Sequence, residues 1–275
     1  MKIFVTGASG FVGQHLVRYL THAGHEVDTR RFDITTPFTV TEKFDVVIHL
    51  AAYNITNVGD TDLSIYVRVN IEGTKHVLSG VQAQKYIFLS TTKFYRKGTE
   101  IIREESEIDP QNPYEQSKWQ AEQECLKLKT SKELVILRGT NVFGPGQPEK
   151  AVIPIFLGKA IHNEPIKVFG PRGAWLQFLY IDDLIQAILK VATTPKINGV
   201  FNLASPELVR LEDLASMIKK ICHSSSEICL TDEGLPPKVE VSCDKIKKAT
   251  GWQPLVSLEE GLRRYYQYYA QQHSS

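Results

Sequence analysis

The sequence has almost no excess charge of either sign. It carries 32 lysine and arginine residues against 31 aspartate and glutamate residues, which leaves a net charge of +1 at pH 7. A protein that attracts nucleic acid or an anionic lipid surface through its overall field needs a clear basic excess. We therefore expect neither nucleic acid nor a membrane among its partners.

Long apolar runs and cysteine-rich segments are also absent. No run approaches the roughly 20 residues that a membrane-spanning helix needs. Residues 1–5 lead into a glycine-rich turn instead of the apolar stretch of a secretory signal. The four cysteines are too few and too scattered for a disulfide framework, and their spacing matches no zinc motif. We expect a cytoplasmic protein with ordinary thiols and no metal site.

Hydrophobic residues make up 42% of the 275-residue chain, which is ordinary for a globular protein with a sizeable core. In the first half, apolar runs at 3–5, 45–50, 86–90 and 133–137 alternate with helical patterns at 11–23, 61–80 and 113–129. Repeated strand–helix–strand order requires crossover connections and produces a parallel sheet. The sequence therefore predicts an α/β fold, a Rossmann-type doubly wound parallel sheet.

The pattern changes after about residue 144, where prolines and glycines become frequent. Further helical patterns lie at 151–162, 178–193, 211–222 and 257–272, and a last strand is expected at 199–203. We predict that residues 1–145, completed by about 178–204, form the Rossmann domain. Residues 146–177 and 205–275 are then a smaller mixed C-terminal substrate lobe.

A glycine-rich turn, TGASGFVG at residues 6–13, follows the first predicted strand and opens the first helix. Glycines at this spacing allow a tight turn, a close approach of the backbone to a pyrophosphate, and close packing of helix on strand. The helix N-terminus adds free N–H groups for the anion. The turn predicts a dinucleotide site, with cofactor contacts from Gly7, Gly10, Phe11, Val12 and Gly13.

The end of the second strand bears on which dinucleotide binds. An acidic residue there would bind the ribose 2′-hydroxyl of NAD, whereas arginine suits the 2′-phosphate of NADP. Arg30 and Arg31 occupy this place, although Asp28 or Asp33 can still serve as the acid. We favour NADP over NAD.

Tyr114 and Lys118 lie four residues apart, on one face of a predicted helix. A free phenol has a pKa of about 10, and a nearby ammonium shifts that pKa toward neutrality. The hydroxyls of Ser90, Thr91 and Thr92 end the preceding strand, where one of them can polarise a carbonyl group. Together with the glycine turn, the pair predicts acid–base catalysis beside a nicotinamide.

Further motifs follow in order along the chain, and they are His49-Leu50-Ala51-Ala52, Asn70 within 69–74, and the segments 89–95, 138–146, 180–184 and 250–254. With the turn and the Tyr–Lys pair, this order resembles the extended short-chain dehydrogenase/reductase family. Within it, the chain is similar to the NAD-dependent epimerase/dehydratase group, which modifies nucleotide sugars. The short segment 30–45 is similar to that of dTDP-4-dehydrorhamnose reductases, which reduce a ketone at C4.

The resemblance implies a role for each matching residue. Tyr114 is the acid/base, Lys118 activates it and holds the ribose, and Thr91 contacts the sugar. The implied cofactor contacts, beyond the turn and the arginine pair, are Asp33, Ile34, Leu50, Ala51, Ala52, Asn70, Tyr114 and Lys118. The implied substrate contacts are Thr91, Thr92, Tyr114 and Asn141, with Asn141 on the diphosphate side.

Two departures from the family pattern limit the reaction. The 4,6-dehydratases of this group carry an Asp-Glu pair after the catalytic threonine, whereas this chain has Thr92 and Lys93, which argues against dehydration. An Arg-Asp pair that many members carry is replaced by Leu176 and Gln177. We expect Arg172 or Lys238 to supply the missing charge.

These features predict an NAD(P)-dependent enzyme that acts at C4 of a nucleotide-linked sugar, and a 4-keto-sugar reductase is preferred. An NAD-dependent 4-epimerase is the first alternative, since it would use the same residues. A non-catalytic dinucleotide-binding protein is the second. The resemblance also implies a homodimer that pairs through the tyrosine helix and the helix near Asn70.

Overall fold

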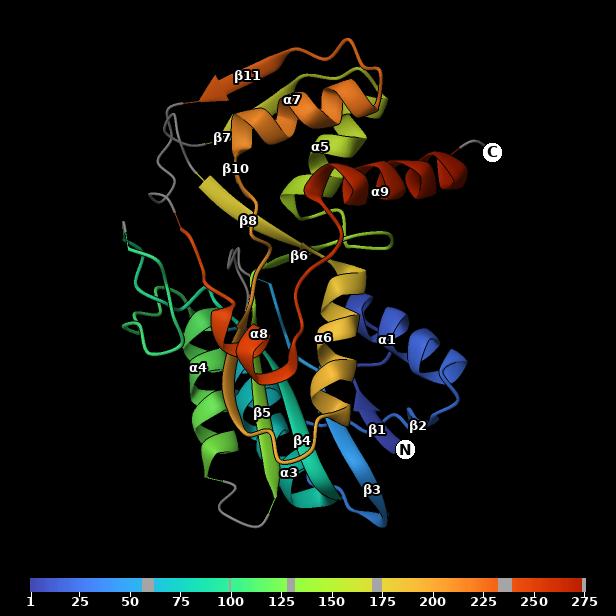
Figure 1. Cartoon of the computed structure of the whole chain (residues 1–275), viewed down its shortest axis with the longest axis vertical. Coiled ribbons are helices and arrows are strands. Elements are labelled where there is room, and N and C mark those ends of the chain that lie inside the picture. The colour runs from blue at the N-terminus through green and yellow to red at the C-terminus, as the bar shows by residue number, and fades with distance from the viewer. Residues whose placement is uncertain (56–61, 99, 128–131, 170–174, 232–238, 274–275) are drawn as a thin grey trace.

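A six-stranded parallel sheet forms the centre of the protein (Figure 1). The structure, a computed structural model, describes all residues except 56–61, 99, 128–131, 170–174, 232–238 and 274–275. The strand order is β2-β1-β3-β4-β5-β9. The bounds are β1 (Lys2–Thr6), β2 (Glu26–Asp28), β3 (Val40–His49), β4 (Val81–Thr91), β5 (Glu133–Gly139) and β9 (Gly199–Leu203). The chain adds β2 on one side of β1 and β3 on the other side, so the strand order reverses between β1 and β3. Ligands of such parallel sheets bind at the carboxyl ends of the strands at this point.

Helices cover both faces of this sheet, as the predicted doubly wound architecture requires (Figure 1). On one face, α1 (Phe11–His22) and α6 (Ile181–Thr193) pack together against side chains such as Ile3, Ile48 and Ile87. On the other face, α3 (Gly73–Gly80) and α4 (Pro113–Leu126) cover Val47 and Phe88. The apolar residues of each strand alternate between two cores, because successive side chains of a strand point to opposite faces.

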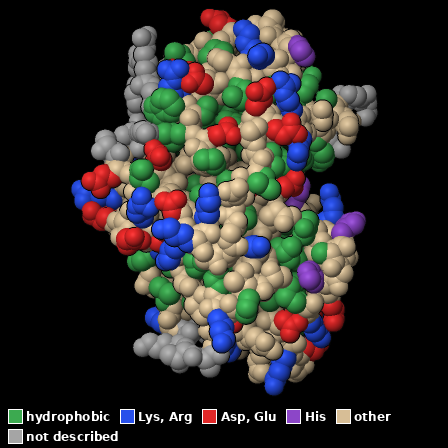
Figure 2. All heavy atoms as spheres, in the orientation of Figure 1, with side chains coloured by type: hydrophobic (Ala, Val, Ile, Leu, Met, Phe, Trp, Pro, Cys, Tyr) green, Lys and Arg blue, Asp and Glu red, His purple; other side chains and the backbone are tan. Residues whose placement is uncertain are grey.

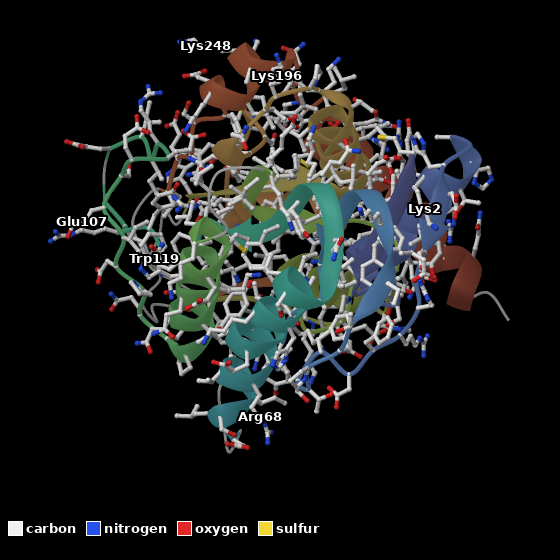
Figure 3. All side chains as sticks on the ribbon, turned by 90° about the horizontal axis from the view of Figure 1, so that it is seen from below. Lys2, Arg68, Glu107, Trp119, Lys196 and Lys248 are labelled. Carbon is white, nitrogen blue, oxygen red and sulfur yellow. The ribbon has the colours of Figure 1, made fainter. Side chains whose placement is uncertain are left out.

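The predicted helix over 61–80 is interrupted in the structure. Between α2 (Ser64–Tyr66) and α3 lies a π-helical segment, η1 (Val67–Glu72), which contains Asn70. Seen from below, η1 and α4 lie next to each other, with Arg68 directed outward from η1 and Trp119 on α4 (Figure 3). A π-helical turn inside an α-helix is rare in proteins, and those that occur often lie at functional sites.

The second half builds a smaller mixed lobe at the carboxyl ends of the strands (Figure 1). One small sheet has the order β10-β8-β6 and the other pairs β11 with β7. The strands are β6 (Asn141–Phe143), β7 (Ile166–Phe169), β8 (Trp175–Tyr180), β10 (Leu208–Arg210) and β11 (Ile228–Thr231). The helices are α5 (Val152–Ile161), α7 (Leu211–Ile221), α8 (Asp244–Thr250) and α9 (Leu258–His273).

The helix predicted from residue 178 was placed three residues too early. Phe178, Leu179 and Tyr180 belong to β8 and pair with β6, and α6 begins only at Ile181. The apolar run of β8 continues directly into the apolar face of α6, so periodicity alone does not separate them. The exact division between domain and lobe stays a prediction, because β6 and β8 join the small sheet while α8 packs on β9.

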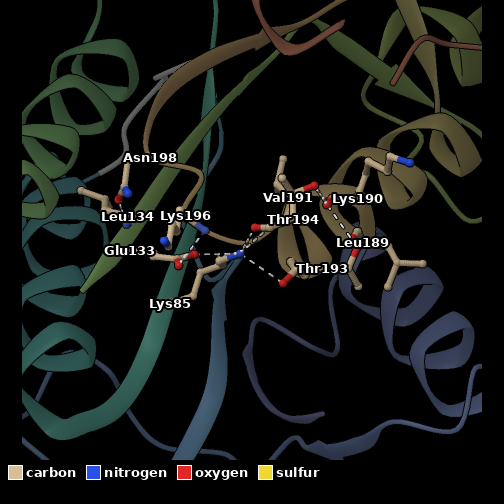
Figure 4. A network of polar contacts seen from close by, with 11 residues as sticks. Lys85, Glu133, Leu134, Leu189, Lys190, Val191, Thr193, Thr194, Lys196 and Asn198 are labelled. Atoms are coloured by element: carbon tan, nitrogen blue, oxygen red, sulfur yellow. Dashed lines mark hydrogen bonds and ion pairs between the residues drawn. The ribbon is translucent and has the colours of Figure 1, made fainter. Parts of the chain in front are cut away.

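Lys85 fastens the far end of the main sheet to α6 (Figure 4). Its Nζ donates hydrogen bonds to the carbonyl oxygens of Val191 (2.8 Å) and Thr194 (2.6 Å) and pairs with Glu133 (3.0 Å). The last carbonyls of a helix have no partners within it, and a cation there also meets the negative end of the helix dipole. This buried lysine therefore has a structural role.

Positive and negative side chains are interspersed over the face in Figure 2, in line with the small net charge. Within the described part of the chain, no helix combines the length and apolarity needed to cross a bilayer. The same residues contain no group of three or more His, Cys, Asp or Glu side chains that could hold a metal ion.

Candidate active site

The glycine turn between β1 and α1 is built in a way that only glycine permits. Gly7 has a positive φ of 71°, and a Cβ there would lie 2.6 Å from the backbone nitrogen of Ala51. A Cβ on Gly13 would lie 2.1 Å from the Gly7 carbonyl oxygen. No side chain caps the first turn of α1, so its N–H groups stay available to an anion. The turn fits a pyrophosphate and lies against the end of β3.

His49 connects this turn to the helix on the other side of β3. Its Nδ1 lies 2.6 Å from Thr6 Oγ1 and its Nε2 lies 3.0 Å from Thr74 Oγ1. Thr74 donates to the Asn70 carbonyl, so its oxygen accepts from Nε2–H, and Nδ1 accepts from Thr6. Burial, with the Lys118 charge as the second cause, lowers the pKa of His49 to about 3. The ring is thus a neutral structural link between the two threonines.

Asn70 joins the segment after β3 to the tyrosine helix. Its side-chain oxygen accepts from the Tyr53 N–H (2.7 Å), and its Nδ2 donates to the Tyr53 carbonyl (2.9 Å) and to Ser117 Oγ (2.8 Å). Ser117 donates in turn to the Tyr114 carbonyl (2.8 Å). The predicted cofactor role of Asn70 is untested, but its amide already acts as a positioning group that fixes α4 near Leu50–Ala52.

Thr91 and Tyr114 meet at the carboxyl end of β4. Thr91 is buried at the strand end, Tyr114 is half-buried in the first turn of α4, and the Thr91 side chain lies close enough to the phenol to lower its pKa. The Asn112 side chain caps α4 by accepting from the Glu115 N–H (3.0 Å), which fixes the position of this turn. The predicted hydroxyl and phenol are therefore brought together.

The expected lowering of the Tyr114 pKa by Lys118 is not found. Burial raises the pKa of Tyr114 to about 12, the hydrogen bond with Thr91 opposes the shift, and the Glu115 charge adds to it. The Lys118 ammonium instead donates to the Leu89 carbonyl at 2.8 Å. That expectation was wrong for this structure, because desolvation outweighs the effect of a cation that is directed toward the strand.

Lys118 remains a suitable partner for a ribose. It is 3% exposed, and its Nζ lies 4.0 Å from the ring centroid of Phe88. Burial lowers the pKa of Lys118 to about 8, so the side chain is mostly charged at pH 7. One of its three N–H donors binds Leu89, which leaves two for a ligand.

The two arginines after β2 have different surroundings. Arg30 pairs with Asp28 (2.6 Å) and Glu42 (3.0 Å), so its charge is already balanced. Arg31 is exposed, and its guanidinium has no hydrogen bond or ion pair among the described residues. The Asp33 carboxylate accepts from the N–H of Thr35 (3.0 Å) in a local turn.

The implied cofactor contacts Asp33 and Ile34 lie next to α3. The Ile34 carbonyl accepts from His76 Nδ1 (2.8 Å), and a Cβ on Gly73 would lie 2.8 Å from Ile34 Cδ1. This packing holds the segment that contains Asp33 and Ile34 against α3.

On the predicted substrate side, Asn141 Nδ2 donates to the Gln177 carbonyl (3.1 Å). The buried Gln177 side chain accepts from the Val241 N–H (2.7 Å) and donates to the Ser205 carbonyl (2.6 Å), so it links three segments of the lobe. Leu176 lies in β8 and provides no charge. Arg172 and Lys238, which we expected to supply the charge of the missing Arg-Asp pair, lie outside the described residues.

Two buried hydroxyls near these strand ends have no hydrogen-bond partner among the residues that the structure describes. They are Ser90 Oγ, beside Thr91 in β4, and Thr140 Oγ1, directly after β5. Buried polar atoms usually have partners, and a ligand at the carboxyl edge of the sheet can supply them after a side-chain rotation. The glycine turn and these hydroxyls are consistent with a dinucleotide and its substrate on this edge.

Sequence reasoning missed a polar cluster beneath the tyrosine helix. Arg138 binds Glu122 at 2.6 Å, donates to Tyr95, and lies 5.0 Å from the ring centroid of Phe94. Arg138 and Glu122 are 3% and 0% exposed. The resemblance included Arg138 in a motif, but only the fold shows that it connects β5 to α4.

Comparisons with known proteins identify the family of the chain. A model described as the NAD dependent epimerase/dehydratase family matches residues 3–204. GDP-6-deoxy-D-mannose reductase from Pseudomonas aeruginosa is 26% identical over 290 residues, covering 95% of each chain. The structure of RMD from Pseudomonas aeruginosa complexed with NADPH has a TM-score of 0.91 at 26% identity and covers 98% of this chain and 99% of that one. UDP-glucuronic acid 4-epimerase from Bacillus cereus, in complex with UDP-glucuronic acid and NAD, has a TM-score of 0.88 at 26% identity, covering 99% and 100%.

Proposed function

Since the chain belongs to the NAD dependent epimerase/dehydratase family, we propose that it reduces a ketone at C4 of a nucleotide-linked sugar. The observation that carries the reductase assignment is the exposed Arg31 after β2, which has no partner among the described residues and suits the 2′-phosphate of NADPH, the cofactor that a reductase consumes. A Tyr114 phenol whose pKa is raised by burial is compatible with proton donation to the ketone.

In this proposal each residue has one task. Thr91 donates a hydrogen bond to the C4 oxygen and Tyr114 transfers its proton to that oxygen. A bound reduced nicotinamide supplies the hydride. Lys118 holds the ribose through the N–H donors that the Leu89 carbonyl leaves free. Asn70 and Ser117 keep α4 in place for this step.

The cofactor we propose is NADP, bound through Arg31. Arg30 would have to leave two carboxylates to reach a 2′-phosphate, whereas Arg31 has no competing partner among the described residues. Asp28 is engaged by Arg30 and is poorly placed to accept from a 2′-hydroxyl. The GDP-6-deoxy-D-mannose reductase relative and the NADPH complex of RMD support this choice.

Stoichiometry distinguishes the proposal from its alternatives. Purified protein is mixed with NADPH and a panel of nucleotide-linked 4-keto-6-deoxyhexoses, and NADPH oxidation is compared with product formation by mass spectrometry. A reductase consumes one NADPH for each product. Protein that carries tightly bound NAD and isomerises nucleotide hexoses without net redox change is the 4-epimerase alternative.

The proposed homodimer has a candidate surface on the helices beside Asn70. Leu63 and Val67 are 53% and 47% exposed and lie four residues apart on the helical segment next to α4. Neighbouring exposed apolar side chains on one helical face are typical of an interface. This supports pairing through α4 and the η1 segment.

A further inference from the structure

A chain of buried hydrogen bonds starts beside the glycine turn. The Ala51 N–H donates to Thr6 Oγ1 at 3.3 Å, and Thr6 Oγ1 lies 2.6 Å from His49 Nδ1. Thr6 directly precedes Gly7, where a Cβ would lie 2.6 Å from the Ala51 nitrogen. The Thr6 hydroxyl is therefore tied to the end of β3, next to the turn that fits a pyrophosphate.

His49 carries this chain from the sheet to the helices beside it. Its Nε2 donates to Thr74 Oγ1 (3.0 Å) in the first turn of α3, and the Thr74 hydroxyl donates to the Asn70 carbonyl (2.6 Å) in η1. Because the Thr74 proton is directed to Asn70, the Thr74 oxygen accepts from the His49 ring. Each group thus accepts one hydrogen bond and donates the next, and bonds that run in one direction strengthen one another.

The Asn70 side chain completes the path to Tyr114. Its Nδ2 donates to Ser117 Oγ (2.8 Å), and Ser117 donates to the Tyr114 carbonyl (2.8 Å). Thr6, the most accessible of the linking side chains, is only 7% exposed. A buried polar network in which every link has a partner favours one geometry, because a displacement leaves a buried group unpaired.

We propose, on the basis of the proposed function, that His49 and Thr74 are positioning residues for the reduction. The chain joins the turn that fits the dinucleotide to the turn of α4 that carries the phenol, so it sets the distance between the two reacting partners. Both side chains are buried and act through Tyr114 instead of touching the substrate. A small misplacement of a catalytic group has a large effect on rate, which makes such a link important.

The kinetic test removes the hydroxyl in the middle of the chain. It uses single turnovers of NADPH with the 4-keto-6-deoxyhexose nucleotide that the protein reduces fastest. Thr74→Val keeps the side-chain shape and should slow hydride transfer about tenfold, while the Kd for NADPH, from fluorescence titration, changes about twofold at most. Thr74→Ser retains the hydroxyl and should recover most of the rate. A role in stability alone predicts the wild-type rate in each folded variant.

A double variant shows whether His49 and Thr74 act in one chain. If they do, His49→Asn combined with Thr74→Val should be no slower than the slower single variant, because the path is already broken. Rate losses that multiply in the double variant would show that the two side chains act independently, and they would overturn the inference.

Hydrogen exchange of the ligand-free protein tests the positioning without any turnover. Amides of residues 114–118, at the start of α4, should exchange about fivefold faster in Thr74→Val, the factor expected for one lost hydrogen bond. Thr250→Val is the matched control, since the Thr250 hydroxyl also donates to the carbonyl four residues earlier, that of Ile246 in α8. This control should leave both the exchange of α4 and the rate of hydride transfer unchanged.

The outcomes separate this inference from the proposed function. Wild-type exchange of α4 in Thr74→Val, or a wild-type rate of hydride transfer, overturns the inference and leaves the reductase proposal standing. A protein that oxidises NADPH with no sugar of the panel refutes the proposed function and the role in reduction with it. Thermal unfolding well above the assay temperature shows that each variant is folded.

Discussion

Tyr114 and Lys118 lie about one turn apart in α4, and their pKa values shift in opposite directions for the same physical reason. Burial disfavours the charged form of each group, so it raises the pKa of the phenol to about 12 and lowers that of the ammonium to about 8. At neutral pH the pair therefore consists of a neutral donor and a mostly charged lysine. This arrangement suits proton donation to a ketone.

We predict that the rate of reduction is constant from about pH 6 to 7.5 and falls as the pH rises through about 8, where Lys118 loses its charge. Tyr114 stays protonated over this range, so it does not cause the fall. Measurement of kcat against pH tests this. Lys118→Arg, whose charge persists to pH values above 12, should shift the fall upward even if its rate is lower. An identical pH profile in that variant would assign the fall to another group.

His49 makes a prediction about stability. Its folded pKa of about 3 lies below the ordinary value of 6.5, so the unfolded chain binds more protons between these values. The contribution of neutral His49 to the free energy of unfolding is therefore fully present above about pH 6.5. This contribution, a few kcal/mol in total, is lost as the pH falls toward 3. Urea unfolding at pH 7.5 and pH 5 measures this. His49→Asn should be less stable at pH 7.5 but lose less between the two pH values, and equal losses would contradict the account.

At the scale of elements, α4 is held to the sheet by a buried ion pair. Glu122 on α4 and Arg138 on β5 are almost inaccessible to solvent, and their closest contact is 2.6 Å. Removal of one partner leaves a buried charge without compensation, which typically costs about 3–5 kcal/mol.

We predict that Glu122→Leu and Arg138→Met each lower the free energy of unfolding by about this amount. The double variant should recover a substantial part of the loss, because neither charge then remains unpaired. Denaturant unfolding of the four proteins completes the cycle. Additive losses in the double variant would show that the two side chains do not act as a pair.

Local patterns predicted the main-sheet elements well and the lobe less well. The alternation of apolar runs and helices, the glycine turn and the Tyr114–Lys118 spacing all depend on nearby residues, and the parallel sheet followed from them. The strands β6 and β10 are three residues long and form only by pairing with β8, so no local signal marks them. The pKa of Tyr114 depends on burial by distant segments, which the helical spacing does not contain.

For the whole molecule, the prediction concerns its assembly. Leu63 and Val67 form an exposed apolar pair close to α4, and the resemblance implied pairing through this region. We predict that the wild type is a dimer by light scattering at micromolar concentration and that Leu63→Glu with Val67→Glu shifts it toward monomer. Ile155→Glu, a similarly exposed position on α5, serves as the control and should stay dimeric. A wild-type protein that is wholly monomeric would refute the dimer.

The central claim concerns the whole enzyme, namely that hydride moves from a reduced nicotinamide to C4 of the sugar while Tyr114 supplies the proton. The most direct measurement uses NADPH deuterated at both C4 positions of the nicotinamide, a nucleotide-linked 4-keto sugar, and mass spectrometry of the product. The account predicts one deuterium at sugar C4 for each NADPH oxidised, and a loss of this transfer by about 100-fold or more in Tyr114→Phe. A product without deuterium, or full transfer by the Tyr114→Phe protein, would contradict it.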